Sequence, residues 1–320
     1  MFYLNHLKKF LLNNKNLEFI VPNYIFYERI DKFLYKIFFE HSYSIIINWI
    51  QLGMIYINYK KAKINQFINQ GERLFIFSMP KLFNKIFFYQ YIDFNIIKED
   101  VNWILINKPP GLVTHPSPGN WNCTLLNGLI NKFEYLKNIY RAGIINRLDK
   151  ETSGVMIVAK NDFARLNLKY QIENNVMVRE YMTIVGGKIL FSGIIKKKLN
   201  KDLFNPMKMS ENKFEKLKKS TTFIIPNRFG YFKDLFVTKV FCIIKTGKKH
   251  QIRSHLSSIK HPILGDNLYG GKNLNFINRH MLHSRMISFK DPYIQKKFLC
   301  YSSNPFDMVN LISKFNWIYK

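Results

Sequence analysis

Side chains that can do chemistry gather from residue 107 onward. They include the carboxylate of Asp149, the phenol of Tyr181 and the guanidinium of Arg253. Each has an ordinary interpretation when taken alone: a turn or helix cap, a packed aromatic and a surface charge. The blocks around them are more informative, and they read NKPPGLVTHPSPGN (107–120), RAGIINRLDKETSGVMIVAKN (141–161), REYMTIVGG (179–187), KTGKKHQIRSHLSSIKHPILGDNLYGG (245–271) and RHMLHSRMISF (279–289).

Histidines in the last two blocks raise the alternative of a metal-dependent hydrolase. The candidate ligands are His250, His255, His261, His280 and His283. His250 and His255 are five residues apart, whereas a helical zinc pair has a spacing of four. No set of cysteines or carboxylates accompanies the histidines at ligand spacing. The sequence therefore predicts no metal site.

The charge of the chain indicates a polyanionic partner. Its 320 residues include 49 Lys and Arg against 21 Asp and Glu, so the formal net charge is 49 − 21 = +28. Nucleic acid is the first expectation for the partner and an anionic membrane surface the second. An AT-rich genome, which over-produces Lys codons, is the alternative source of part of this charge. We expect nucleic acid as the partner.

Composition also bounds the cellular setting. Hydrophobic residues make up 47% of the chain, enough to bury a sizeable core. No uninterrupted apolar run is long enough to cross a membrane. Three scattered cysteines, Cys123, Cys242 and Cys300, are typical of a reducing compartment. We therefore expect a cytoplasmic protein that does not associate with membranes, and a monomer.

The elements that must position the chemical side chains follow from hydrophobic spacing. In the N-terminal part, apolar residues recur at helical spacing over 30–38 and 44–52, and alternate in strand fashion after Gly53. Residues 196–220 are polar and basic, which favours a surface loop or hairpin. The expected segments are a leader at 1–27, a small α/β unit at 28–77, a linker at 78–90 and a second domain at 91–320.

The small unit resembles an S4 RNA-binding module. The S4 pattern is a helix pair, a glycine, a strand ending in an Asn-Gly turn, and a final Gly-Asp. Gly53, Asn58 and Gly71-Glu72 fall at the matching places. The resemblance implies that this unit binds RNA.

The blocks of the second domain, taken together and in order, resemble the RluA-type pseudouridine synthases. RAGIINRLDKETSGVMIVAK is similar to that family's RAGIVHRLDKDTSG motif, and TGKKHQIRSH with HPILGDNLYGG to its TGRTHQIRVH and HPxxGDxxYGG motifs. Within the family the chain is most similar to the S4-bearing branch that acts on large-subunit (23S) ribosomal RNA. The resemblance implies an α+β catalytic domain with a mixed, mainly antiparallel sheet.

The resemblance also implies roles for individual residues. Asp149 is the catalytic carboxylate, Arg253 its ion-pair partner and Tyr181 the ring that stacks on the target base. The RNA-binding residues that we predict are Arg147, which holds the flipped nucleotide, and Lys108, Lys248 and Lys249, which contact phosphates. For these lysines a solvated surface position is the alternative. No cofactor is needed, because uridine is isomerised without a redox change or a leaving group.

Two departures from the family pattern keep a second hypothesis open. Asn146 stands where the family has His, and Lys248 where it has Arg. Asparagine cannot become cationic, and lysine lacks the planar fork of arginine. The alternative is a non-catalytic RNA-binding factor of ribosome assembly with a decayed isomerase site. The first hypothesis is a synthase that modifies uridines of large-subunit RNA, free or in the assembling subunit, in a stem-loop at the subunit interface.

Overall fold

The protein forms two compact units, Met1–Ile86 and Phe87–Lys320. The structure is a computed structural model that describes residues 17–38, 43–77, 89–117, 120, 122–202, 205, 207–211 and 219–318. The division falls inside the segment expected as a linker, of which residues 78–88 lie outside the described residues. Residues 1–16 of the expected leader also lie outside them.

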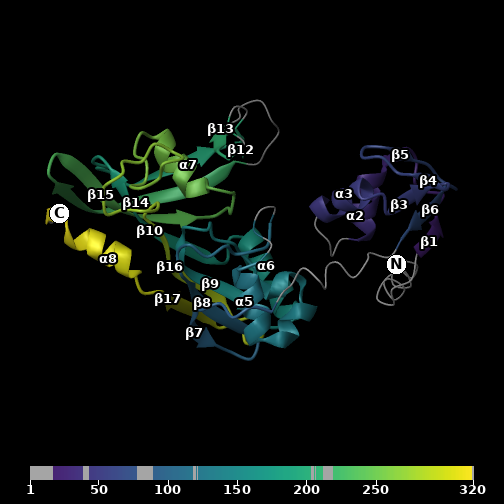
Figure 1. Ribbon diagram of the computed structural model, residues 1–320, viewed down its shortest axis with the longest axis horizontal. Helices are drawn as coiled ribbons and strands as arrows, with labels where there is room; N and C mark the ends of the chain where they lie inside the picture. Colours follow the sequence, from purple (N-terminus) through teal and green to yellow (C-terminus); the bar gives the residue numbers. More distant parts are fainter. Residues whose placement is uncertain are drawn as a thin grey trace. The chain divides into compact units, whose positions relative to one another are not determined.

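The first unit packs two helices against a small sheet (Figure 1). Its core joins the inward side chains of the strands to those of the helices, for example Ile55 and Leu74 to Leu34 and Trp49. The elements are β1 (Leu17–Ile20), β2 (Glu28–Arg29), α2 (Ile30–Ile37), α3 (Tyr43–Gln51), β3 (Ile55–Ile57), β4 (Lys60–Lys61), β5 (Phe67–Ile68) and β6 (Arg73–Ile76). Helices and strands form close to the expected positions; the S4-like identity of the unit stays a prediction.

The first unit begins earlier than the sequence suggested. β1 lies within residues 1–27, expected as a leader, yet it pairs antiparallel with β6 from Leu17↔Ile76 to Ile20↔Arg73. Val21 is fully buried and its N–H donates to the Glu72 carbonyl at 2.9 Å. The physical reason is the open edge of β6, whose unpaired backbone groups are satisfied by a further strand.

The second unit is built on a ten-stranded sheet. Its strand order is β11-β14-β15-β10-β16-β9-β8-β7, with β17 beside β16 and β18 beside β14. The strands are β7 (Asn95–Glu99), β8 (Trp103–Lys108), β9 (Ser153–Ala159), β10 (Val178–Gly186), β11 (Gly193–Lys197), β14 (Ser220–Phe232), β15 (Leu235–Ile244), β16 (Leu282–Lys290), β17 (Lys297–Tyr301) and β18 (Asn316–Ile318). β9 and β16 run parallel and the other pairs of this sheet, among the described residues, are antiparallel. The expected α+β class with a mixed, mainly antiparallel sheet is confirmed.

Helices and a hairpin surround this sheet (Figure 1). The helical elements are α5 (Leu125–Lys132), the 3-10 helices η1 (Glu134–Asn138) and η2 (Tyr140–Gly143), α6 (Asp162–Glu173), α7 (Gln251–Ser258) and α8 (Phe306–Ser313). α5 begins with a capping box between Thr124 and Asn127. The polar segment 196–220 forms, in its described part, the hairpin of β12 (Leu199–Lys201) and β13 (Met209–Glu211).

Both faces of the sheet are covered at β8 and β9. Ile104 and Ile106 of β8 pack in one core cluster with α5, and Trp103 and Leu105 pack in another with α6. All seven residues of β9 are buried, as is usual for a strand covered on both sides. This rigid centre carries the loop before β9, where the candidate site lies.

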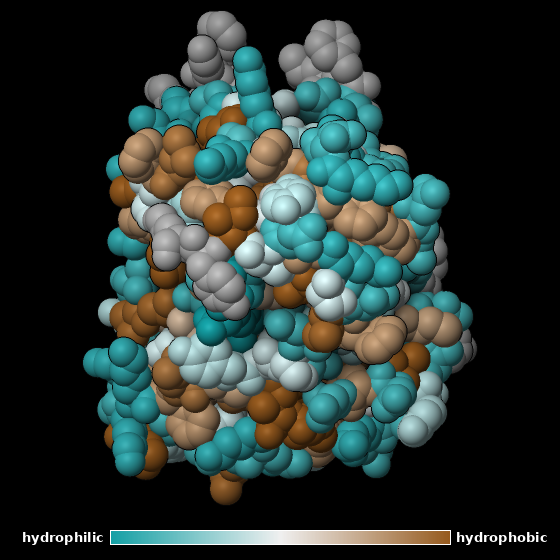
Figure 2. Space-filling view, turned by 90° about the vertical axis from the view of Figure 1, so that its left-hand side faces the viewer, coloured by the Kyte–Doolittle hydropathy of each residue, from teal (hydrophilic) through white to brown (hydrophobic). Residues whose placement is uncertain are grey.

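The surface around α8 and the β14–β15 hairpin is mixed. Figure 2 shows small apolar groups there, separated by hydrophilic side chains. Phe306 of α8 is 83% exposed, whereas Met308 and Leu311 of the same helix are buried in the core. The helix is thus held by one face only.

We expect Gly154→Ala to destabilise the second unit strongly. Gly154 has φ +115°, and a Cβ atom there would lie 2.2 Å from the Ser284 carbonyl oxygen of the parallel neighbour β16. The substitution should lower the free energy of unfolding by more than about 2 kcal/mol, measured by chemical denaturation. Gly186→Ala is the control, because no heavy atom lies within 4 Å of its added Cβ. Equal stability of the two variants would contradict the expectation.

Candidate active site

A cavity of about 350 Å³ opens in the second unit where the loop before β9, strand β10 and the start of α7 meet. This volume is that of a small-molecule or single-nucleotide site. One acidic side chain, Asp149, lines it. The basic side chains that line it are Arg141, Arg147, Arg179, Lys248, Lys249 and Arg253. The cavity is therefore an anion-attracting site built around a single carboxylate.

The backbone on either side of Asp149 is held by hydrogen bonds to four successive carbonyl groups. The donors and acceptors are Thr114 Oγ1 to Leu148 O (2.7 Å), Thr152 N to Asp149 O (3.0 Å), Lys108 Nζ to Lys150 O (3.0 Å) and Arg279 Nη1 to Glu151 O (2.8 Å). Leu148 is also buried in the core. The carboxylate is thus carried by a loop that has little freedom to move.

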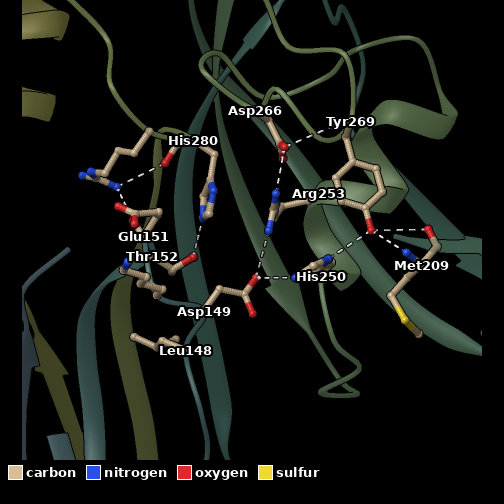
Figure 3. Close-up of polar contacts among 12 residues, drawn as sticks. Leu148, Asp149, Glu151, Thr152, Met209, His250, Arg253, Asp266, Tyr269 and His280 are labelled. Atoms are coloured by element: carbon tan, nitrogen blue, oxygen red, sulfur yellow. Dashed lines mark hydrogen bonds and ion pairs between the residues drawn. The ribbon is translucent and has the colours of Figure 1, made fainter. Parts of the chain in front are cut away.

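Arg253 of α7 is the cation that faces Asp149. Its Nη1 lies 3.4 Å from Asp149 Oδ2, and its Nε and Nη2 bind the two oxygens of Asp266 at 2.7 and 2.9 Å. Figure 3 shows Asp266, Arg253 and Asp149 in a row. Burial alone would lower the pKa of Arg253, but the bond to Asp266 and the charges of Asp266 and Asp149 raise it. Arg253 is therefore always charged and is oriented by a carboxylate that is only 1% exposed.

His250 is a neutral neighbour of the carboxylate. Its Nε2 lies 3.8 Å from Asp149 Oδ2 and its Nδ1 lies 3.2 Å from Tyr269 Oη. Burial lowers the pKa of His250 to about 4, with Arg253 and Lys249 acting in the same direction. At neutral pH the ring is uncharged, so the countercharge of Asp149 comes from Arg253.

Tyr181 lies on β10 and lines the cavity from below the carboxylate loop. It is 5% exposed, and its strand partners are Cys242 of β15 and Ser284 of β16. Burial raises the pKa of its phenol, while Arg179 and a hydrogen bond with Ser284 act against that shift. The phenol is thus neutral at physiological pH, and it shares the cavity with Asp149 and Arg253.

The prediction that Lys108 contacts phosphate is wrong in this structure. Lys108 is fully buried, and its ammonium donates to the carbonyls of Pro109, Leu112 and Lys150 at 2.8, 2.8 and 3.0 Å. Burial lowers its pKa to about 7. The physical reason is the turn that follows it, which folds two of these carbonyls back over the ammonium. Lys108 holds the carboxylate loop instead of binding RNA.

The other predicted cations occupy the mouth of the cavity. Arg147, Lys248 and Lys249 are exposed and line it. Their phosphate contacts stay a prediction.

Sequence reasoning gave no role to Asp266 and Arg179, and it named His250 only as a candidate metal ligand and Asn146 only as a departure from the family motif. Asp266 contacts Arg253, and His250 contacts Asp149. Both residues lie inside the sequence motifs, and that position was the signal that could have indicated their role. Arg179 and Asn146 line the cavity, and each has a buried polar atom without a hydrogen-bond partner among the described residues, Nε and Oδ1. Such orphaned atoms are invisible before the chain is folded.

The histidines of the last two blocks each have hydrogen-bond partners of their own. His280 Nε2 bonds Thr152 Oγ1 at 2.8 Å, His283 lies between Ser153 and Ser302, and His255 bonds Ser220. No group of three or more His, Cys, Asp or Glu residues is placed to hold a metal in the part of the chain that the structure describes. The geometry therefore gives the metal-hydrolase alternative no ligand set. Separately, none of the described helices is long and apolar enough to cross a membrane.

Comparisons with known proteins agree with the site. Residues 102–258 match the family model for RNA pseudouridylate synthase. Ribosomal large subunit pseudouridine synthase D of Buchnera aphidicola (subspecies Schizaphis graminum) is 36% identical over 300 residues, which cover 89% of this chain and 93% of the relative. The enzyme of the same name from Neisseria meningitidis serogroup A is 33% identical, over 89% of this chain and 78% of its own.

A solved structure shows the same fold. Human RNA Pseudouridylate Synthase Domain Containing 1 superposes with a TM-score of 0.56 at 21% identity, covering 71% of this chain and 89% of its own. The residues that line the cavity fall in or near the matched family region, and both relatives match over 89% of this chain. The chain thus belongs to the RluA-type family of RNA pseudouridine synthases.

Proposed function

We propose that this enzyme isomerises specific uridines of large-subunit ribosomal RNA to pseudouridine. The observation that carries the proposal is the carboxylate of Asp149, held 3.4 Å from Arg253 as the single acid of a cation-lined cavity. The relatives above are named for the large ribosomal subunit, which supports ribosomal RNA, free or in an assembling subunit, as the substrate.

One available carboxylate suits an isomerase better than a glycosidase. Hydrolysis of a glycosidic bond uses two carboxyl groups, one as acid and one as base or nucleophile. Asp266 is the nearest second carboxylate in the ion-pair row, but both of its oxygens bind Arg253 and it is 1% exposed. Among the described residues that line the cavity, Asp149 is the one carboxylate placed to reach a bound nucleotide.

The reaction begins at the N1–C1′ bond of the target uridine. Asp149 either attacks C1′ or takes the proton from C2′, and the bond electrons leave with N1 of the uracil. The ring then turns and C5 bonds to C1′. In the first route this displaces the Asp149 carboxylate from C1′, and in the second Asp149 returns the proton to C2′. Finally C5 loses its proton and N1 gains one. No electrons or groups enter or leave overall, so the chemistry requires no cofactor.

The remaining residues bind and orient the nucleotide. A uridine in structured RNA must leave its stack before C1′ can be reached, which costs a few kcal/mol. Tyr181 offers an aromatic face to the flipped base, and Arg147, Lys248 and Lys249 at the mouth offer positive charge to the backbone. These contacts offset the cost of flipping.

The N-terminal unit supplies a second anchor in this proposal. If it binds RNA as its S4-like pattern predicts, two linked contacts hold the RNA more tightly than either alone. We further propose that the enzyme acts as a cytoplasmic monomer.

Asp149→Asn tests the proposal directly. The amide cannot attack C1′ or accept the C2′ proton, so the single-turnover rate should fall at least about a thousandfold. RNA affinity should stay within about threefold, because shape and the cations are kept. The measurement is a pseudouridine map of unmodified large-subunit RNA after incubation with each protein. Asp162→Asn, at an exposed position of α6 outside the cavity, is the control. Full activity of Asp149→Asn would exclude the assignment, and RNA binding without conversion by the wild-type protein would favour the assembly factor.

Asp266→Asn should slow the reaction without touching the RNA. Losing one carboxylate frees Arg253 to turn, and a small misplacement of a catalytic group costs about a hundredfold. RNA affinity should be nearly unchanged because Asp266 is buried. Asp291→Asn is the control, since Asp291 is also a buried carboxylate, accepts from Trp103 Nε1 at 2.7 Å and does not line the cavity. A similar rate loss in both variants would show a general effect of destabilisation.

Replacing Lys248 and Lys249 together by Met should weaken the salt dependence of RNA binding. Each lost phosphate contact lowers the slope of log affinity against log salt by about 0.7–0.9, so the pair should lower it by about 1.5. Binding is measured by titration at several salt concentrations. The neighbouring exposed lysines Lys296 and Lys297, which do not line the cavity, make the matched double variant. An unchanged slope in the first variant would remove these residues from the RNA interface.

A further inference from the structure

Arg179 differs from the other buried cations of the described residues because its charge is not compensated. Four Lys and Arg side chains are buried in the described part of the chain. Three are compensated: Lys108 by three carbonyls, Arg253 by two carboxylates, and Arg279 by Asp307 and backbone carbonyls. Arg179 is 4% exposed and has a single long bond, from Nη2 to the Lys245 carbonyl at 3.5 Å.

The missing compensation is costly for the free enzyme. No carboxylate lies within ion-pair distance of Arg179 among the described residues, and its Nε–H has no acceptor. An unpaired buried charge costs several kcal/mol unless a ligand completes it. Burial accordingly lowers the pKa of Arg179. Because this uncompensated guanidinium lines the cavity, we expect its hydrogen-bond acceptor to be part of the substrate.

Arg179 lies at a different place from the cations that are predicted to contact phosphate. Arg147, Lys248 and Lys249 are exposed at the mouth, where a hydrated backbone can reach them. Arg179 is buried instead, although its Nη1 lies only 3.1 Å from the place where a Cβ on Gly247, the residue before Lys248, would stand. It is two residues from Tyr181 on β10, so both side chains point to the same face of the strand. Because Tyr181 is the ring proposed to lie against the base, the part of the nucleotide next to Arg179 is the base as well.

A second orphaned atom fits the same base. Asn146 Oδ1 lines the cavity, is buried, and has no donor. Uracil offers carbonyl oxygens as acceptors and N3–H as a donor. The cavity thus holds an unused cationic donor and an unused acceptor, which match the two kinds of polar atom on a uracil edge.

We propose that Arg179 binds a carbonyl oxygen of the target uracil and stabilises the negative charge that the ring gains when the N1–C1′ bond breaks. This inference rests on the proposed function. When that bond breaks, its electron pair stays with N1 and spreads to O2 and O4, whether Asp149 attacks C1′ or takes the C2′ proton. The charge disappears when C5 bonds to C1′, C5 loses its proton and N1 gains one. The cation is present throughout, so no further reactant is needed.

The energetic logic explains why the enzyme keeps an uncompensated charge. Neutral uracil gives the guanidinium only a carbonyl dipole, whereas the detached ring gives it a full opposite charge. An interaction that is stronger after bond breaking than before it accelerates the chemical step. A carboxylate beside Arg179 would remove the cost in the free enzyme and the catalytic gain together.

The test compares Arg179→Met and Arg179→Lys with the wild-type enzyme on two RNA substrates. One carries uridine at the target position and the other 5-fluorouridine, whose fluorine makes the ring anion intrinsically more stable. Single-turnover loss of the intact nucleoside is followed after digestion of the RNA. With uridine, Arg179→Met should be slower by about a hundredfold or more, with KM within about threefold. With 5-fluorouridine, the defect should shrink at least about tenfold, because less stabilisation is needed.

The controls separate charge stabilisation from structure and from phosphate binding. Arg285→Met removes an arginine that pairs with Glu180, outside the set of residues that line the cavity, and should change both substrates by one common factor. Thermal unfolding reports whether Arg179→Met folds; if it does not, Arg179→Lys carries the test, with a smaller defect of the same substrate dependence. An equal defect on both substrates, or a defect in KM alone, would overturn the inference. Failure of the wild-type enzyme on uridine would instead overturn the proposed function beneath it.

Discussion

The site depends on the hydrogen bonding of four successive backbone carbonyl groups in the loop that carries Asp149. Residues 148–151 lie between η2 and β9, partly inside the protein, where an unsatisfied backbone acceptor is costly. A threonine hydroxyl, a backbone N–H, a buried ammonium and a buried guanidinium each bind one of them. Three of these donors, Lys108, Thr114 and Arg279, come from segments far from the loop in the chain, so its bonds require β8 and the segment before β16 to be in place. The position of the Asp149 carboxylate therefore depends on elements that are distant from it in the sequence.

Electrostatics then sets what the loop can do. Arg253 stands between Asp149 and Asp266, so the carboxylate has a charged partner that cannot swing away. His250 stays neutral because burial lowers its pKa to about 4. The buried cations divide into those completed by the protein, Lys108, Arg253 and Arg279, and Arg179, which the protein leaves open. The compensated cations hold the site together, whereas Arg179 is the cation that we propose binds the substrate.

Sequence reasoning worked best where a motif keeps residues in fixed register. Asp149, Tyr181 and Arg253 come from three separate blocks, and the fold brings all three to one cavity, as the resemblance implied. It failed where burial decides the role. Lys108 was predicted to contact phosphate because lysines are usually exposed. The folded turn at Pro109-Pro110-Gly111 shows instead that its ammonium donates to backbone carbonyls. β1 was missed because a short edge strand has no periodicity of its own and exists only through its partner β6.

The sequence by itself determined the family, the class of fold and the chemical groups, because long motifs and the pattern of apolar residues are local properties of the chain. Only the tertiary structure decided which charges are compensated. Lys108 and Arg179 are both basic residues inside motifs, and the residue type alone does not distinguish them. Compensation depends on which acceptors lie within about 3 Å. Lys108 has such acceptors in the turn after β8 and the loop before β9, whereas the acceptor of Arg179, just after β15, lies at 3.5 Å. The difference between a cation that builds the site and one that serves the reaction is therefore a property of the folded chain.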